Sequence, residues 1–270
     1  MVKKPFKVIL FLFMILITFY CIYKFYPADI KPLEVSQYKQ FRITFDYPIV
    51  FDNTTKENII IKDKDGNSVD SYVFLSTDKK SIIINPPVDG YSLNENYSIT
   101  VSPKIHFENF ELKNKKVVQF KVTKDVRQAP VKVKRKAQIG DIVGVSGEFM
   151  GYKYDHYGLY LGNNKVIHYW SNTGKAEDTE IMETDMNKYF VDGKYFVLDL
   201  KDYSKFNAEE TIKRSKERLG EKNYDLLQNN CEDFVIWCKT DDSKSFQVAN
   251  VPKDQIQVIR EFMSLGLSLQ

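Results

Sequence analysis

One cysteine and two histidines have the types and the spacing of a nucleophilic catalytic site. Cys231 follows Asn229-Asn230, and His156 and His168 lie twelve residues apart on either side of a Gly-Asn-Asn run. A thiol activated by an imidazole base attacks carbonyl carbons, and the imidazole later returns a proton to the leaving group. The sequence therefore predicts acyl-transfer chemistry, with Cys231 as nucleophile, His156 as base and His168 as the residue that holds His156 in the right tautomer.

Residues 155–170 predict a β-hairpin that brings the two histidines together. Gly162-Asn163-Asn164 supplies residues that tolerate positive φ and therefore indicates the turn. With a three-residue loop, His156 lies opposite Trp170, and His168 is its diagonal neighbour on the same face, with backbones about 7–8 Å apart. A change of register by one residue would move His168 to the other face, so the contact depends on this register.

The segment that begins at Cys231 predicts a helix, with Asn230 as its N-cap. The apolar stripe at i, i+3, i+4 and i+7 consists of Cys231, Phe234, Val235 and Cys238. The first turn of a helix has a positive dipole end and free N–H groups, which favour a thiolate. Cys231 is therefore expected at the edge of a buried face, with raised reactivity, and nearby backbone N–H groups are candidate oxyanion donors.

Each of these residues also has a purely structural explanation. A lone cysteine is more often a buried core thiol, and a lone strand histidine is more often structural than catalytic. The C-x₆-C spacing of Cys231 and Cys238 does not suit zinc, so no metal and no cofactor are predicted. Seven helical residues rise about 10 Å, more than a disulfide spans, so both thiols are expected to be free. Residue types alone leave catalysis and structure as equal alternatives.

The motifs also resemble a known family. The segments DHYGLYLG (155–162) and NCEDFVIWC (230–238), with GDIV at 140–143, are similar to the lecithin:retinol acyltransferase and phospholipase/acyltransferase family over roughly residues 138–250. The resemblance implies a permuted papain-like α+β domain over 138–270. It also implies that Cys231 is the nucleophile, His156 the base and His168 the third residue. Asp233 departs from the pattern, because many relatives have histidine there, but that position is not one of the three.

The resemblance implies an enzyme that transfers or hydrolyses acyl groups of phospholipids through a cysteine thioester. Water as acceptor would give a phospholipase, and an amine or alcohol would give a transferase. Two alternatives stay open: a cysteine amidase or endopeptidase that acts on cell-wall peptides, and a non-catalytic surface adhesion or scaffold protein. Neither the acyl donor and acceptor nor the oligomeric state follows from the sequence.

Residues 35–124 predict an all-β sandwich. Apolar and polar residues alternate along 41–46 and 118–122, and Asp65-Gly66 and Pro86-Pro87 are turn signals. The runs FRITFDYPI, ENIIIKDKDGNSV and SIIINPPVDGY resemble bacterial Ig-like domains of the SbsA type, which implies a spacer or wall-binding role. Residues 125–137 contain five basic residues and are predicted to be a solvated linker, with attraction to an anionic surface as the alternative.

The N-terminus predicts a membrane anchor. Residues 1–7 contain three lysines and no acid, and residues 8–23 are uncharged and mostly apolar. We expect a cytoplasmic tip at 1–7, a transmembrane signal anchor at 8–26 and extracytoplasmic main domains. A cleaved signal peptide is the alternative, but no A-x-A pattern follows the apolar run.

Composition agrees with a multidomain chain of this kind. The net charge of +3 is too balanced to indicate nucleic-acid binding, and 43% hydrophobic residues are enough for packed cores. The predicted architecture is an N-terminal membrane helix, an all-β Ig-like sandwich and an α+β domain. The expected localisation is the cell membrane, and the expected partners are the membrane itself and a phospholipid or other acyl substrate.

Overall fold

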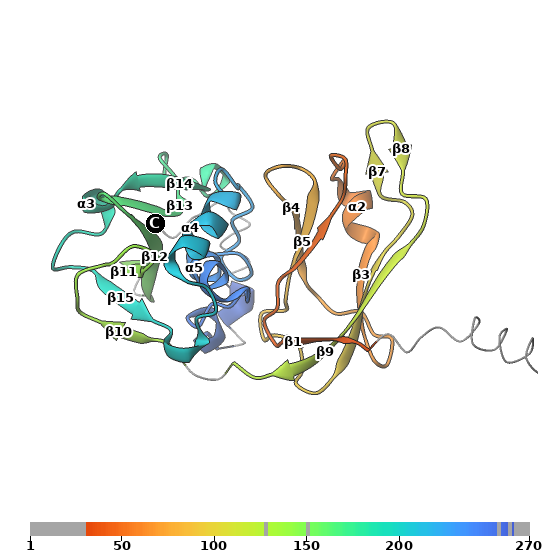
Figure 1. The fold of residues 1–270 in the computed structure, drawn as a ribbon, viewed down its shortest axis with the longest axis horizontal. Coiled ribbons are helices and arrows are strands. Elements are labelled where there is room, and N and C mark those ends of the chain that lie inside the picture. The colour runs from red at the N-terminus through yellow and green to blue at the C-terminus, as the bar shows by residue number, and fades with distance from the viewer. Residues whose placement is uncertain (1–30, 127–128, 150–151, 253–254, 259–260, 262–270) are drawn as a thin grey trace, which may run out of the picture. The chain divides into compact units, whose positions relative to one another are not determined.

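The computed structural model describes residues 31–126, 129–149, 152–252, 255–258 and 261 (Figure 1). The chain divides at Leu33 into two units, and the contacts below concern the second, Glu34–Gln270. The predicted cytoplasmic tip at 1–7 and membrane anchor at 8–26 lie outside the described residues. Within the part of the chain that is described, no helix has the length and apolar character needed to span a membrane.

Two β-sheets formed by residues 33–124 enclose a shared core. The four-stranded sheet has the order β1 (Leu33–Ser36), β9 (Lys116–Lys124), β6 (Asn96–Val101), β3 (Ile59–Asp63), and the three-stranded sheet has the order β2 (Phe41–Thr44), β5 (Ser81–Asn85), β4 (Tyr72–Leu75). A short helix, α2 (Asn53–Glu57), and the pair β7 (His106–Phe107) and β8 (Phe110–Glu111) complete this part. Every second residue of β6 is buried, whereas the central strand β5 is buried throughout. This part of the chain is β-rich with one short helix, and the predicted relation to Ig-like domains stays a prediction.

A six-stranded sheet carries the histidine segment. Its order is β10 (Val131–Val133), β15 (Phe196–Asp199), β11 (Ile142–Phe149), β12 (Tyr152–Gly162), β13 (Lys165–Trp170), β14 (Glu180–Asp185), and neighbouring strands are antiparallel. The strand β10 comes from the predicted linker, where two β-branched valines flank a lysine that suits an exposed sheet edge.

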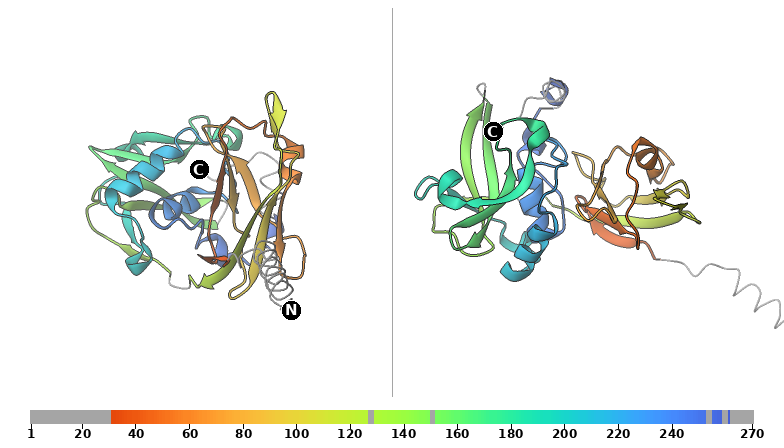
Figure 2. Two further views of the ribbon diagram at one scale, coloured as in Figure 1. Left: turned by 45° about the vertical axis from the view of Figure 1, so that its right-hand side comes forward. Right: turned by 90° about the horizontal axis from the view of Figure 1, so that it is seen from above.

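Helices α4 (Ala208–Glu217) and α5 (Cys231–Thr240) pack on this sheet (Figure 2). The short helix α3 (Met186–Tyr189) follows β14, and the 3₁₀ turns are η1 (Ala176–Asp178), η2 (Lys201–Tyr203) and η3 (Val248–Asn250). The face of α5 buries Phe234, Val235 and Cys238 in one core with β12 and β13, as the helical spacing predicted. The chain is thus β-rich with several helices.

The predicted N-cap of α5 is confirmed. The Asn230 side chain accepts hydrogen bonds from the backbone N–H groups of Glu232 (2.8 Å) and Asp233 (3.0 Å). The Asp233 carboxylate in turn accepts from the Asn230 N–H (3.0 Å), which completes a capping box. Asp233, the departure from the family pattern, therefore fixes the first turn that carries Cys231.

Candidate active site

The strands β12 and β13 form the predicted hairpin, but its turn is one residue shorter than expected. Asn163 and Asn164 have φ values of 48° and 59°, as in the two-residue type I′ turn, and Gly162 pairs with Lys165. One residue of β12, Leu161, has no partner on β13 and forms a β-bulge.

The bulge restores the register on which the predicted histidine contact depends. Leu159 pairs with Ile167, and the same register continued along the strands sets His156 opposite Trp170. The Nε2 atom of His156 lies 2.7 Å from the Nδ1 atom of His168. The predicted meeting of the two imidazoles is therefore confirmed, although the loop that produces it has a different form.

Aromatic side chains surround the histidine pair. Phe190 stacks on His156 at 5.7 Å between ring centroids, and Trp170 stacks on His168 at 5.6 Å. Burial lowers the pKa of His156 to about 4, and burial and then the neighbouring His156 lower the pKa of His168 well below its ordinary value. Both imidazoles are therefore neutral at pH 7.

Thr184, which the sequence analysis did not identify, completes the histidine chain. Its Oγ1 lies 2.8 Å from Nε2 of His168, which is itself fully buried. Thr184 is on β14, where it pairs with Val166 of β13. No local motif marks this threonine, because its place beside His168 depends on the pairing of two strands that are separated in the chain.

Cys231 lies against β12 at the residue that follows His156. Its side chain is only 8% exposed and is buried in one core with Tyr157, and the backbone N–H groups of Tyr157 and Glu232 lower the pKa of its thiol. Within the described residues, no direct hydrogen bond joins Cys231 to His156. The structure nevertheless brings the predicted nucleophile to the same stretch of strand as the predicted base.

The protonation state of Cys231 differs from the sequence-based expectation. Burial and, to a smaller extent, the neighbouring acidic side chains of Glu232 and Asp233 together raise its pKa to about 12, against the opposing effect of the backbone N–H groups of Tyr157 and Glu232. The thiol is therefore favoured over the thiolate that the helix start was expected to promote. The physical reason is that the sulfur lies in an apolar core with two acidic residues in its own helical turn.

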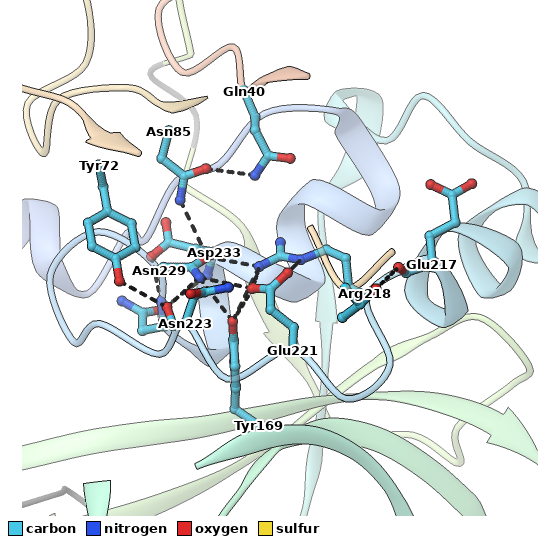
Figure 3. A network of polar contacts seen from close by, with 12 residues as sticks. Gln40, Tyr72, Asn85, Tyr169, Glu217, Arg218, Glu221, Asn223, Asn229 and Asp233 are labelled. Carbon is cyan, nitrogen blue, oxygen red and sulfur yellow. Dashed lines mark hydrogen bonds and ion pairs between the residues drawn. The ribbon is translucent and has the colours of Figure 1, made fainter. Parts of the chain in front are cut away.

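A buried polar network holds the chain just before Cys231 (Figure 3). The Arg218 guanidinium donates to Glu221 at 2.5 Å and to Asn229 at 2.9 Å, and Tyr169 on β13 donates its hydroxyl to Glu221 at 2.5 Å. All four residues are at most 2% exposed. Asn85, at the end of β5, extends the network by donating to the Gln228 carbonyl oxygen at 2.6 Å. The two residues before the N-cap of α5 are thereby fixed.

The remaining candidate residues have structural surroundings. Cys238 is buried in the core of α5, and both described cysteines are free thiols, as predicted. His106 on β7 contacts Glu111 at 3.3 Å and lies in the two-stranded sheet β7–β8, not in the sheet that contains the histidine pair. In the described ranges, no cluster of three histidine, cysteine or acidic side chains could hold a metal ion.

Comparison with known proteins identifies this region. Residues 135–244 match the family described as "Lecithin retinol acyltransferase", and this range includes His156, His168 and Cys231. The chain contains a lecithin retinol acyltransferase-like domain. The expected resemblance is confirmed for this domain, which hereafter is called the LRAT-like domain.

Two curated proteins show the same similarity. The lecithin retinol acyltransferases of Rattus norvegicus and Mus musculus are each 30% identical over 127 residues, which cover 37% of this chain and 53% of the relative. The chain thus spans about half the length of the curated relatives that it matches.

Solved structures give only distant likenesses. A fragment of native alpha-2-macroglobulin from Escherichia coli is 11% identical with a TM-score of 0.29, covering 64% of this chain and 66% of that one. The N-terminal part of the bacterial S-layer protein SbsC is 13% identical with a TM-score of 0.30, covering 64% and 43%. Such TM-scores carry no argument about the fold, so the SbsA-type and permuted papain-like relations stay predictions.

Proposed function

We propose that the LRAT-like domain transfers or hydrolyses acyl groups of phospholipids through a thioester on Cys231. One observation carries the proposal. Cys231 is buried in one core with Tyr157 of β12, while the residue before Tyr157, His156, is hydrogen-bonded to His168. The proposed thiol, base and orienting group thus lie on α5, β12 and β13, three elements that contact one another, and the similarity to lecithin retinol acyltransferases supports an acyl substrate.

The hydrogen bonds suggest the working tautomers. When His156 carries its proton on Nε2 and donates to Nδ1 of His168, its Nδ1 has a free lone pair and can accept a proton. His168 then carries its proton on Nε2 and donates to Thr184. Because the thiol has a raised pKa and the imidazole a lowered one, the resting pair is neutral, and the proton moves as the substrate reacts.

The reaction has two balanced halves. In the first, the sulfur of Cys231 bonds to the acyl carbonyl carbon as His156 takes the thiol proton. The bond from that carbon to the glycerol oxygen then breaks, and His156 gives its proton to the departing lysophospholipid. In the second half, water or another acceptor attacks the thioester, His156 takes the acceptor's proton and returns it to the released sulfur.

The backbone N–H groups of Tyr157 and Glu232 have a further role in this scheme. Both lower the pKa of the thiol and so favour the negative charge that develops when the thiol loses its proton, while the Glu232 N–H also donates to the Asn230 side chain. His168 and Thr184 hold the His156 ring without contacting the substrate.

The other segments fit an enzyme that works at a membrane. In this proposal, residues 8–26 form a single-pass anchor with residues 1–7 in the cytoplasm, so that the extracytoplasmic LRAT-like domain stays close to lipid. Residues 35–124 form an Ig-like spacer, and residues 138–270 have the permuted papain-like topology.

The test uses the full chain with vesicles of diacyl phosphatidylcholine, and the readout is release of fatty acid and lysophospholipid. Product is expected from the wild type and from Cys238→Ala, which removes the other buried thiol of α5. None is expected from Cys231→Ala or His156→Ala. Lack of lipid product together with cleavage of cell-wall peptides would replace the lipid by a peptide substrate. Failure on both substrates would favour a non-catalytic surface protein.

A further inference from the structure

We propose that Gln247 is a positioning residue that holds the strand of the base, β12, against the helix of the nucleophile, α5. Gln247 lies outside residues 135–244, the range that matches the family. The inference rests on the proposed function, since it concerns how the gap between His156 and Cys231 is set.

The argument begins with the direction of the backbone groups of β12. In an antiparallel strand, successive residues turn their N–H and C=O groups to opposite edges. Tyr160 faces the β11 side, because its N–H and C=O bond to Asp141 (2.9 Å) and Gly140 (2.8 Å). Asp155 and Tyr157 are an odd number of residues away, so their backbone groups face the other edge. That is the edge on which β13 pairs with β12 farther along.

On this edge, the Gln247 side chain acts in place of a neighbouring strand. Its Oε1 accepts a hydrogen bond from the Asp155 N–H (2.6 Å), and its Nε2 donates to the Asp155 carbonyl oxygen (3.0 Å). The next residue with its backbone groups on the same edge, Tyr157, is buried in one core with Cys231, and its N–H lowers the pKa of the thiol. Gln247 therefore binds β12 at one of the residues that flank His156, and Cys231 packs beside the other.

The other end of Gln247 is tied to the nucleophile helix. Its backbone N–H donates to Oε2 of Glu232 at 3.0 Å, and the Ser245 hydroxyl donates to the same oxygen at 2.6 Å. Glu232 is 1% exposed and follows Cys231 directly. A continuous path of bonds thus runs from Cys231 through Glu232 and Gln247 to Asp155 and His156. Because displacements of about 1 Å at reacting groups can cost about a hundredfold in rate, this path is expected to control kcat.

Three variants of the full chain test this role. Gln247→Met keeps the length of the side chain and removes both bonds to Asp155, and kcat for acyl release is expected to fall about tenfold or more. KM should change by less than about threefold, because Gln247 contacts no substrate in this scheme. Gln119→Met, at an exposed position on β9, is the matched control and should behave as wild type.

Gln247→Glu gives a signature that a merely structural role would not produce. A carboxylate cannot donate to the Asp155 carbonyl oxygen, whereas a protonated carboxyl can replace the amide donor. The activity of this variant relative to wild type should therefore rise as pH falls from about 7 to about 5, across the range in which a glutamate takes up its proton. A constant ratio across that range would contradict the proposal.

The alkylation rate of Cys231 by iodoacetamide separates this inference from the proposed function, because it needs no lipid. In Gln247→Met the rate at neutral pH should fall towards that of His156→Ala. If the wild type releases no fatty acid but this fall occurs, the lipid activity is wrong and the positioning role stands. Wild-type values of both kcat and alkylation rate in a folded Gln247→Met would overturn the inference. If Gln247→Met does not fold, the pH signature of Gln247→Glu decides.

Discussion

The hydroxyl oxygen of Thr184 lies 2.8 Å from Nε2 of His168, so a threonine of β14 ends the hydrogen-bond chain that starts at His156. We predict that Thr184→Val lowers kcat by about five- to twentyfold, because a lost neutral hydrogen bond is worth about 1–2 kcal/mol and leaves a buried imidazole nitrogen unpaired. Thr184→Ser keeps the hydroxyl and should retain most of the activity. Steady-state kinetics on phosphatidylcholine vesicles measure both, and equal losses in the two variants would argue against a role for the hydroxyl.

The pH dependence of activity should reflect the lowered pKa of His156. Since burial lowers this pKa to about 4, the imidazole stays a free base well below its ordinary pKa of about 6.5. The acid limb of kcat/KM is therefore expected near pH 4, and the raised pKa of Cys231 predicts no limb from thiolate formation between about pH 6 and pH 9. An acid limb near pH 6.5 in a pH–rate profile would show that His156 is solvated in the working enzyme.

The same shift has a consequence for stability. The unfolded chain binds a proton at His156 below about pH 6.5, and the folded chain does so only near pH 4. The contribution of this group is therefore fully present above about pH 6.5 and is lost as pH falls towards 4. Urea unfolding at several pH values should show a smaller decrease over this range in His156→Gln than in the wild type.

Gly158 is expected to be intolerant of a side chain. A Cβ at this position would lie 2.6 Å from Cγ2 of Val166 and 3.2 Å from Cβ of His168. Gly158→Ala should therefore cost about 1–3 kcal/mol of unfolding free energy through overpacking and should displace His168, with a loss of activity. Gly147→Ala is the control, because its Cβ would meet only the far end of the Tyr154 ring, which can move. Urea unfolding measures both variants. Equal losses of unfolding free energy in Gly158→Ala and Gly147→Ala would contradict the packing argument.

The buried pair of Arg218 and Glu221 should matter far more than an exposed ion pair. Glu221→Gln leaves a buried guanidinium without its charged partner and is expected to cost about 3–5 kcal/mol. Asp185→Asn breaks the exposed pair with Lys165 and should cost less than about 1 kcal/mol. Urea unfolding at neutral pH compares the two, and similar losses would mean that water reaches the Arg218 site.

The sequence predicts those parts of the site that depend only on interactions between residues close together in the chain. The N-cap at Asn230, the buried stripe of α5 and the contact between His156 and His168 follow from capping, helical spacing and hairpin register, each readable within a few residues. Thr184 and Gln247 could not be predicted, because their partners are fixed by strand pairing and by a segment that returns from beyond α5. The pKa of Cys231 differs from the expectation for a related reason: the helix start is a local feature, whereas burial is a property of the whole core.

The bulge at Leu161 means that the register of the β12–β13 hairpin depends on the number of residues between the two histidines. The two-residue turn alone would put His168 on the face opposite to His156. The one unpaired residue, Leu161, shifts the pairing by one residue and so returns His168 to the face of His156. Loss or gain of a single residue between the two histidines would shift the register and move the side chains of one strand to the opposite face of the sheet. Loss of one residue from the bulge together with a gain of one in the turn would restore the register that pairs the two histidines.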